Sequence, residues 1–288
     1  MTVFDTLITV AQLRQLREAG ADIVILDCSF DLADPDAGTR LYVEGHIPGA
    51  RYVHLEQDLS GPATGSNGRH PLPDREALAA RMRALGVNDA TQVVGYDVNG
   101  NAGAARLWWL LRWIGHRAVA ALDGGKQAWI AAGGELESGM PEAGPVPGTL
   151  QAGVSLVPDV VSADDVLANI ASGDRTVIDA RDPARFRGDP EAPDPVKGRI
   201  PGARNRFFRD NLDSEGRFQP PAVLAAAFAG ALGHSDAERA IMQCGSGVTA
   251  CHNLLALEIA GLPGARLYPG SWSEWIADPS RPVATGDS

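Results

Sequence analysis

The sequence GHIPGAR at residues 45–51 recurs as GRIPGAR at residues 198–204. Three further pairs of segments recur in the same order and at a nearly constant spacing: IVILD at 23–27 with TVID at 176–179, ALG at 84–86 with ALG at 231–233, and LDGGKQAW at 122–129 with LYPGSWSEW at 267–275. Segments that repeat in a kept order indicate a duplicated domain, with a few loop residues gained or lost between the copies.

The length of the chain agrees with two domains, because its 288 residues compare with a usual domain size of roughly 100–200 residues. The segment between the two copies is rich in Pro and Gly, which is typical of a semi-extended linker. We therefore predict a first domain at residues 1–137, a linker at 138–150 and a second domain at 151–288.

Short β-branched runs alternate with longer segments of helical period along both copies. The expected strands include residues 23–26, 92–96, 176–178 and 240–243. Apolar strands that alternate with helices predict an α/β fold in each domain, with a central parallel sheet flanked by helices on both faces. Ligands of such sheets bind beyond the carboxyl ends of the strands, so a site is expected in the turn after a strand.

Composition excludes several classes of protein. The chain is 44% hydrophobic and 21% charged, as in ordinary globular proteins, and its formal charge of −11 offers no basic surface for nucleic acid. We find no stretch that approaches 18 apolar residues and no basic, then apolar, signal sequence at the start. We therefore expect a cytoplasmic protein with neither a membrane nor a nucleic acid as partner.

The three cysteines, Cys28, Cys244 and Cys251, are too few and too irregularly spaced for a disulfide framework or a zinc site. The six histidines show no metal-binding spacing either. The sequence therefore predicts no metal, and free thiols in a reducing compartment.

The loop CGSGVTAC at 244–251 follows the strand expected at 240–243 and precedes a helical run. Gly245 and Gly247 have no Cβ, so the loop can curl until several backbone N–H groups face one point, which makes an anion-binding nest. The dipole of the following helix adds to the same field. Both effects favour the thiolate of Cys244 over the thiol, which predicts a nucleophilic sulfur at neutral pH.

The same nest is suited to the extra sulfur of a persulfide, whose terminal atom is also anionic. The hydroxyls of Ser246 and Thr249 can donate further hydrogen bonds. A lone cysteine is commonly a buried and inert one, but a structural cysteine needs no Gly-x-Gly turn in front of a helix. Cys244 is therefore the predicted nucleophile.

The other cysteines are expected to be structural. Cys251 lies two helical turns beyond Cys244, and Cys28 follows a strand. In the first copy the place of Cys244 is taken by Asp97, whose carboxylate cannot relay sulfur. The first domain is therefore expected to lack the nucleophile.

Nearly the whole chain, from about residue 24 to 283, resembles the two-domain or tandem rhodaneses, which are thiosulfate and 3-mercaptopyruvate sulfurtransferases. The resemblance is carried by GHIPGA, ARLWWLLRWIGH, LDGGKQAW, ARFRG, CGSGVTAC and GSWSEW. It implies a catalytically silent first domain and a cleft between the domains. It also implies an enzyme without cofactor that transfers sulfur from a small donor to a thiol or cyanide through a persulfide.

By position, the resemblance also implies the roles of particular residues. Cys244 matches the catalytic cysteine, and Arg185 matches the arginine that binds the anionic group of the donor. The remaining substrate-binding residues are those of the cradle: Gly245, Ser246, Gly247, Val248 and Thr249.

The signals for the identity of the donor conflict. The Gly-Ser-Gly loop resembles the mercaptopyruvate enzymes, but the second arginine that often follows ARFRG in those enzymes is missing from residues 191–195. The segment NGRHPLP at 67–73 resembles bacterial enzymes usually classed as thiosulfate sulfurtransferases. Because the loop offers no cation beyond Arg185, the doubly charged thiosulfate is the less favoured donor, and 3-mercaptopyruvate is preferred.

Two other functions stay open. Phosphatases of the rhodanese fold have an arginine six residues after the cysteine, where this chain has Ala250. Non-catalytic rhodanese-like domains act as binding modules, but they need no intact nucleophile loop such as the one around Cys244.

Overall fold

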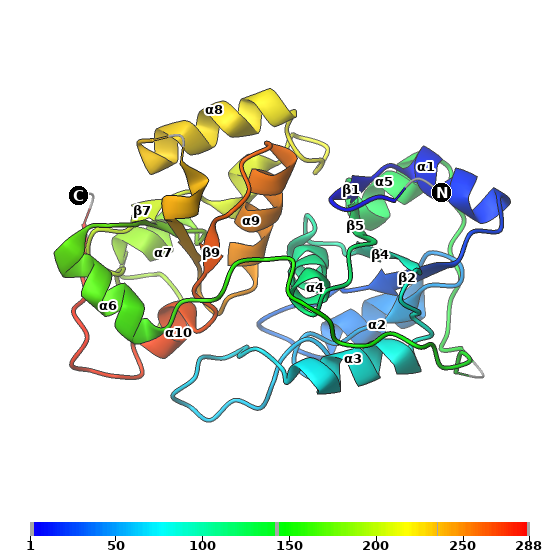
Figure 1. The fold of residues 1–288 in the computed structure, drawn as a ribbon, viewed down its shortest axis with the longest axis horizontal. Helices are drawn as coiled ribbons and strands as arrows, with labels where there is room; N and C mark the ends of the chain where they lie inside the picture. The colour runs from blue at the N-terminus through cyan, green and yellow to red at the C-terminus, as the bar shows by residue number, and fades with distance from the viewer. Residues whose placement is uncertain (1–2, 142–143, 235, 287–288) are drawn as a thin grey trace. The chain divides into compact units, whose positions relative to one another are not determined.

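The structure, a computed structural model, describes residues 3–141, 144–234 and 236–286 and divides into two compact units (Figure 1). Unit 1 contains the chain up to Gly61, Leu72–Leu156 and Asp213–Phe218. Unit 2 contains Pro62–Pro71, Val157–Leu212 and the chain from Gln219 onward. A single cut within 138–150 therefore does not describe the compact units, because two short segments far apart in the sequence are exchanged between the halves.

Unit 1 is built on a five-stranded sheet in which every neighbouring pair is parallel, with the order β1-β5-β4-β2-β3. Its strands are β1 (Leu7–Ile8), β2 (Ile23–Asp27), β3 (Arg51–Tyr52), β4 (Gln92–Tyr96) and β5 (Val119–Leu122). Almost every residue of β2, β4 and β5 is buried. These strands consist of apolar runs because helices cover both faces of the sheet.

The helices of unit 1 are α1 (Val10–Glu18), α2 (Ala37–Glu44), α3 (Arg75–Ala84), α4 (Ala102–Trp113) and α5 (Gly125–Ala131). Local sequence fixes the starts of α1 and α3. Thr9 and Gln12 form a capping box at α1, and the Asp74 carboxylate accepts the N–H of Ala77 at α3. Trp108 and Trp109 of α4 are buried, as expected for core tryptophans.

Unit 2 repeats this plan with four parallel strands in the order β7-β6-β8-β9. Its strands are β6 (Thr176–Asp179), β7 (Arg204–Asn205), β8 (Ala240–Gln243) and β9 (Arg266–Leu267). Its helices are α6 (Ala163–Ser172), α7 (Pro183–Arg187), α8 (Pro221–Leu232), α9 (Thr249–Ile259) and α10 (Ser271–Trp275), with short 3₁₀ helices η1 (Phe208–Asn211) and η2 (Ala237–Arg239).

The predicted α/β fold with parallel sheets and flanking helices is confirmed in both units (Figure 1). Strand β4 lies inside the sheet of unit 1 between β5 and β2, and β8 lies inside that of unit 2 between β6 and β9. The carboxyl end of β4 leads into Asp97, and that of β8 leads into Cys244. The two equivalent turns therefore occupy the edge of the sheet at which ligands of parallel sheets bind. None of the helices described is both long and apolar enough to traverse a bilayer.

Candidate active site

Cys244 lies at the carboxyl end of β8, and its side chain is buried. Two backbone N–H groups of the same loop point at its sulfur, because the nitrogens of Gly247 and Ser246 lie 3.1 and 3.5 Å from Sγ. Helix α9 begins at Thr249. The predicted arrangement of a sulfur over converging N–H groups, in front of a helix, is thus present.

Close approaches surround both glycines of this loop, to backbone at Gly247 and to an arginine side chain at Gly245. Gly247 has a φ of 80°, and a Cβ built there would lie 2.3 Å from the carbonyl oxygen of Pro269. A Cβ on Gly245 would lie 3.0 Å from Nη2 of Arg185. Any side chain at 247 would therefore open the turn, and one at 245 would displace a guanidinium group.

The segment that starts α10 holds the cysteine loop in place. The Cys244 N–H donates to Oγ of Ser271 at 3.1 Å, and its carbonyl accepts the N–H of Trp272 at 3.0 Å. The carbonyl of Gly245 accepts the N–H of Ser273 at 2.9 Å. Ser271 has a φ of 54°, a left-handed conformation that is costly for a residue with a side chain. Its hydroxyl takes part in two hydrogen bonds, accepting the N–H of Cys244 and donating to the Tyr268 carbonyl, and these offset this cost.

The Ser246 hydroxyl is paired with a histidine from a distant part of the chain. Nδ1 of His70 lies 2.7 Å from Oγ of Ser246, and His70 is buried. His70 belongs to the segment Pro62–Pro71, which is part of unit 2. No local pattern in the sequence points to this histidine, since 176 residues separate it from Ser246.

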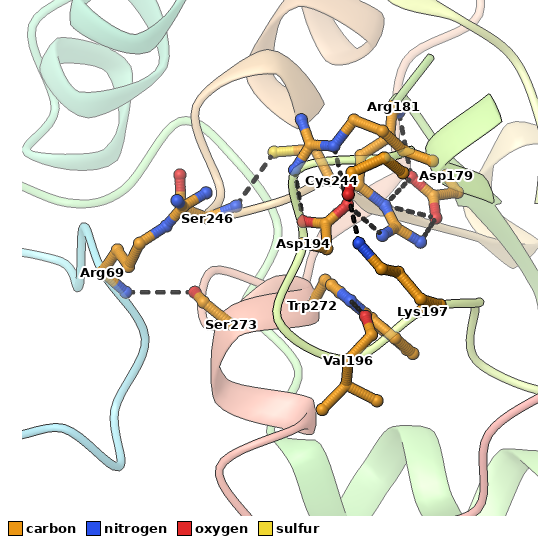
Figure 2. A network of polar contacts seen from close by, with 12 residues as sticks. Arg69, Asp179, Arg181, Asp194, Val196, Lys197, Cys244, Ser246, Trp272 and Ser273 are labelled. Carbon is orange, nitrogen blue, oxygen red and sulfur yellow. Dashed lines mark hydrogen bonds and ion pairs between the residues drawn. The ribbon is translucent and has the colours of Figure 1, made fainter. Parts of the chain in front are cut away.

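Arg185 of α7 is held by a carboxylate that the sequence did not suggest. Its Nε and Nη2 donate to the two oxygens of Asp194 at 2.8 and 2.6 Å. Asp194 also accepts from Arg181 at 3.4 Å, and Arg181 forms a buried pair with Asp179 at 2.7 Å (Figure 2). Burial alone would raise the pKa of Asp194, but the hydrogen bonds and charge of Arg185 lower it below its ordinary value. The arginine is therefore oriented by a bidentate ion pair.

The expectation that the loop has no cation beyond Arg185 is wrong. Nη2 of Arg69 lies 3.3 Å from the position of a Cβ on Gly245, next to the guanidinium of Arg185. The Arg69 N–H donates to Oγ of Ser273 at 3.0 Å (Figure 2). In the sequence, residues 67–73 carry only a family resemblance, because nothing local connects this segment to the cysteine loop.

The remaining predicted residues lie as follows. Val248 immediately precedes α9 and Thr249 begins it, but within the described ranges the hydroxyl of Thr249 makes no hydrogen bond to Sγ of Cys244. Cys251 is buried in α9, and its thiol donates to the Gly247 carbonyl at 3.3 Å. Cys28 is buried in unit 1, where burial and the charges of Asp97 and Asp27 raise the pKa of its thiol well above the ordinary value.

Of the residues that the structure describes, no group of three His, Cys, Asp or Glu side chains is placed to hold a metal ion. The cysteine loop offers one sulfur atom, two N–H groups directed at it and a serine hydroxyl, and other segments of unit 2 bring a histidine to that hydroxyl and two guanidinium groups beside Gly245. These groups suit the binding of a small anion next to a sulfur nucleophile.

Comparison with known proteins gives concordant matches. The profile of the Rhodanese-like domain matches twice, at residues 9–132 and 162–278. A probable 3-mercaptopyruvate sulfurtransferase from Pseudomonas aeruginosa is 49% identical, over 96% of this chain and 97% of the relative. SseB from Mycobacterium tuberculosis, a putative thiosulfate sulfurtransferase, is 41% identical over 97% of both chains. The crystal structure of SseA from Escherichia coli, described among 3-mercaptopyruvate sulfotransferases, has a TM-score of 0.78 at 32% identity, over 93% of this chain and 99% of that one.

The duplicated parallel-sheet unit, matched in both halves, defines a protein with two rhodanese-like domains. The chain belongs to the rhodanese family. It is a sulfurtransferase, an enzyme that moves a sulfane sulfur from a small-molecule donor to a thiol acceptor. Because the relatives are sulfurtransferases, the two alternative functions, a phosphatase and a non-catalytic binding module, are rejected.

Proposed function

We propose that this enzyme takes sulfur from 3-mercaptopyruvate and that Cys244 carries it as a persulfide. The Cys244 thiolate forms a bond to the sulfur of the donor, and the C–S bond of the donor breaks. The electron pair of that bond goes to the enolate of pyruvate, and C3 takes up the proton released by the donor thiol. Cyanide or a thiolate then bonds to the outer sulfur of the persulfide, and Cys244 leaves as a thiolate.

In this mechanism the N–H groups of Ser246 and Gly247 stabilise the anionic sulfur. Their nitrogens lie 3.5 and 3.1 Å from Sγ of Cys244. Arg185, oriented by Asp194, binds the carboxylate of the donor. Gly245, Val248 and Thr249 complete the cradle through their backbone.

The contact of 2.7 Å between His70 and Ser246 is the observation that carries the identity of the donor. Negative charge develops on the keto oxygen of mercaptopyruvate as its C–S bond breaks. With its proton on Nδ1, His70 donates to Oγ of Ser246, and the hydroxyl proton of Ser246 is then available to that oxygen. Sulfite leaves thiosulfate with its charge already on three oxygens, so thiosulfate gains little from this pair. Among the relatives, the name of the one at 49% identity also agrees with mercaptopyruvate.

The test compares kcat/KM for 3-mercaptopyruvate and for thiosulfate at one cyanide concentration. We expect at least a tenfold preference for mercaptopyruvate. Ser246→Ala and His70→Ala should each lower kcat/KM for mercaptopyruvate by about 10²-fold, as for the loss of an oxyanion donor, and should change the value for thiosulfate much less. His234→Ala serves as the matched control, because His234 is a partly buried histidine that follows the C-cap Gly233 of α8. A tenfold preference for thiosulfate, or equal losses with both donors, would overturn the proposal.

We also propose that the enzyme works in the cytoplasm, without a nucleic-acid or membrane partner. The three cysteines are all free thiols, which suits a reducing compartment. The net charge of −11 opposes binding to polyanions. Fractionation of cells, followed by detection of the protein in the soluble cytoplasmic fraction, would test this location.

A further inference from the structure

We infer that Arg69 is a second donor-binding residue, which holds the carboxylate of the donor together with Arg185. The inference rests on the proposed function, because it assigns a further residue to the same site. The arginine comes from the segment Pro62–Pro71, which precedes the rest of unit 2 in the chain by more than 80 residues yet lies in that compact unit.

The backbone on both sides of Arg69 is fixed to the cysteine loop and its neighbours. The Arg69 N–H donates to Oγ of Ser273 at 3.0 Å, and the next residue, His70, lies 2.7 Å from Ser246. On the other side, Gly68 has a φ of 85°, and a Cβ there would lie 2.8 Å from the carbonyl oxygen of Gly270. The Arg69 side chain is exposed, but the backbone that carries it is held in place on both sides. The positions that its guanidinium group can occupy are therefore limited.

The Arg69 side chain runs from its Ser273 contact toward the cysteine loop (Figure 2). Its Nη2 lies 3.3 Å from the position of a Cβ on Gly245, and Nη2 of Arg185 lies 3.0 Å from the same point. Two guanidinium groups thus meet over a residue without a side chain, directly after Cys244. The absence of a Cβ keeps that space open, and two planar donors beside it suit a carboxylate.

The charges at this point are unequal. Both oxygens of Asp194 are engaged by Arg185, whose positive charge is thereby largely compensated. Within the part of the chain that the structure describes, no acidic side chain forms an ion pair with Arg69, although Asp194 is near enough for Arg69 to contribute to lowering its pKa. Arg69 therefore supplies the uncompensated positive charge that attracts the carboxylate of the donor, and Arg185 supplies a guanidinium group of fixed orientation that binds it.

This division favours a donor with one carboxylate, as in a short 2-oxo acid that carries a thiol. One bound carboxylate balances the charge of Arg69, while its oxygens can accept hydrogen bonds from both arginines. The second cation that the stretch at residues 191–195 fails to provide is thus supplied from outside the second sequence copy.

The test uses Arg69→Gln and Arg69→Lys in the full chain, with Arg239→Gln as the matched control. Arg239 lies in η2 at the amino end of β8, at the opposite end of the strand from Cys244. We expect Arg69→Gln to raise KM for 3-mercaptopyruvate at least tenfold, the effect of about 1.4 kcal/mol of lost binding, with kcat within about threefold. Arg69→Lys should recover part of the loss, and Arg239→Gln should match the wild type.

A second measurement separates donor binding from later steps. Enzyme already loaded with sulfur should react with cyanide at the wild-type rate in Arg69→Gln, because the donor has then left. Pyruvate should inhibit this variant at least tenfold more weakly than the wild type. An unchanged KM and unchanged inhibition by pyruvate, with thermal melting as in the wild type, would overturn the role of Arg69. Turnover that persists in Cys244→Ser would instead overturn the proposed function.

Discussion

The turn after β4 in unit 1 and the turn after β8 in unit 2 differ chiefly in the residue that receives the backbone N–H groups. In unit 1 this residue is Asp97, which is fully buried and has four donors. One oxygen accepts the N–H groups of Asn99 and Asn101 at 2.7 and 2.8 Å. The other accepts those of Gly103 and Ala104 at 2.7 and 3.1 Å. In unit 2 the sulfur of Cys244 accepts two, at 3.1 and 3.5 Å.

The difference teaches how one loop geometry serves either structure or chemistry. A carboxylate fills the nest with an anion that is permanently part of the protein, and it ties the loop to the start of α4. A single sulfur is smaller and makes fewer and longer contacts, which agrees with the proposal that the nest of unit 2 receives a second sulfur atom. Burial raises the pKa of Asp97, and the four backbone hydrogen bonds oppose that rise.

The segments that support the two turns differ as well. In unit 1, Gly125 has a φ of 57°, and Lys126 donates its N–H to the Asp97 carbonyl at 3.2 Å. In unit 2 the equivalent left-handed position is Ser271, followed by Trp272, which donates to the Cys244 carbonyl. Gly125 adopts the left-handed conformation without strain. Ser271 adopts it with backbone strain, but its hydroxyl accepts the N–H of Cys244.

Replacement of Cys244, the proposed nucleophile, should have the largest effect. Cys244→Ser is expected to lower turnover by at least about 10³-fold, since a serine hydroxyl cannot form a persulfide. The melting temperature should stay close to that of the wild type. The mass of the Cys244 peptide after incubation with donor should rise by one sulfur in the wild type only. Comparable turnover in the serine variant would show that sulfur travels by another residue.

Removal of the anion from the other nest should instead destabilise unit 1. Asp97→Ala leaves four N–H groups without their acceptor, three of them buried and that of Asn99 partly buried, and we expect the free energy of unfolding of unit 1 to fall by at least about 3 kcal/mol. KM for the donor should remain within about twofold of the wild type. Asp36→Ala, at an exposed position without a side-chain capping bond, is the control. A loss below 1 kcal/mol in denaturant-induced unfolding would contradict this structural role.

Loss of the Ser271 hydroxyl should have an intermediate effect. Ser271→Ala removes the acceptor of the Cys244 N–H, and we expect kcat/KM to fall about tenfold, equivalent to about 1.4 kcal/mol. Ser271→Gly should show the same loss of activity but greater stability than the alanine variant, because glycine adopts the left-handed conformation without strain. Wild-type kcat/KM in both variants would reduce Ser271 to a turn residue.

The other two cysteines should have the smallest effect. Cys28→Ala and Cys251→Ala are each expected to retain kcat/KM within about threefold of the wild type, since both thiols are buried and donate to backbone carbonyls, of Leu26 and Gly247 respectively. Because the pKa of Cys28 is raised, its thiol is protonated at neutral pH and becomes a thiolate only above that raised value. Iodoacetamide at pH 7 should therefore label Cys244 and spare Cys28, as peptide mass spectrometry would detect. Rapid labelling of Cys28 would contradict its burial.

The amino-acid sequence by itself determined the duplication, the parallel sheets and the position of the cysteine loop. Each of these is encoded locally. The runs at 92–96 and 240–243 form β4 and β8 as predicted, and the glycines of the loop stand next to the cysteine that they serve. Alignment of the two copies also showed that Asp97 stands in the first copy where Cys244 stands in the second. Such an alignment needs no tertiary information.

Only the tertiary structure decided which other side chains surround the loop. Arg69 and His70 approach across separations of 204 and 176 residues, measured to Ser273 and Ser246. Asp194 is close to Arg185 in sequence, yet its ion pair depends on how the chain folds back after α7. Periodicity and turn-forming residues predict structure from neighbours within a few residues. These contacts instead arise when distant segments pack together, and no local pattern in either segment predicts its partner. The charge of the proposed donor site is therefore a property of the fold.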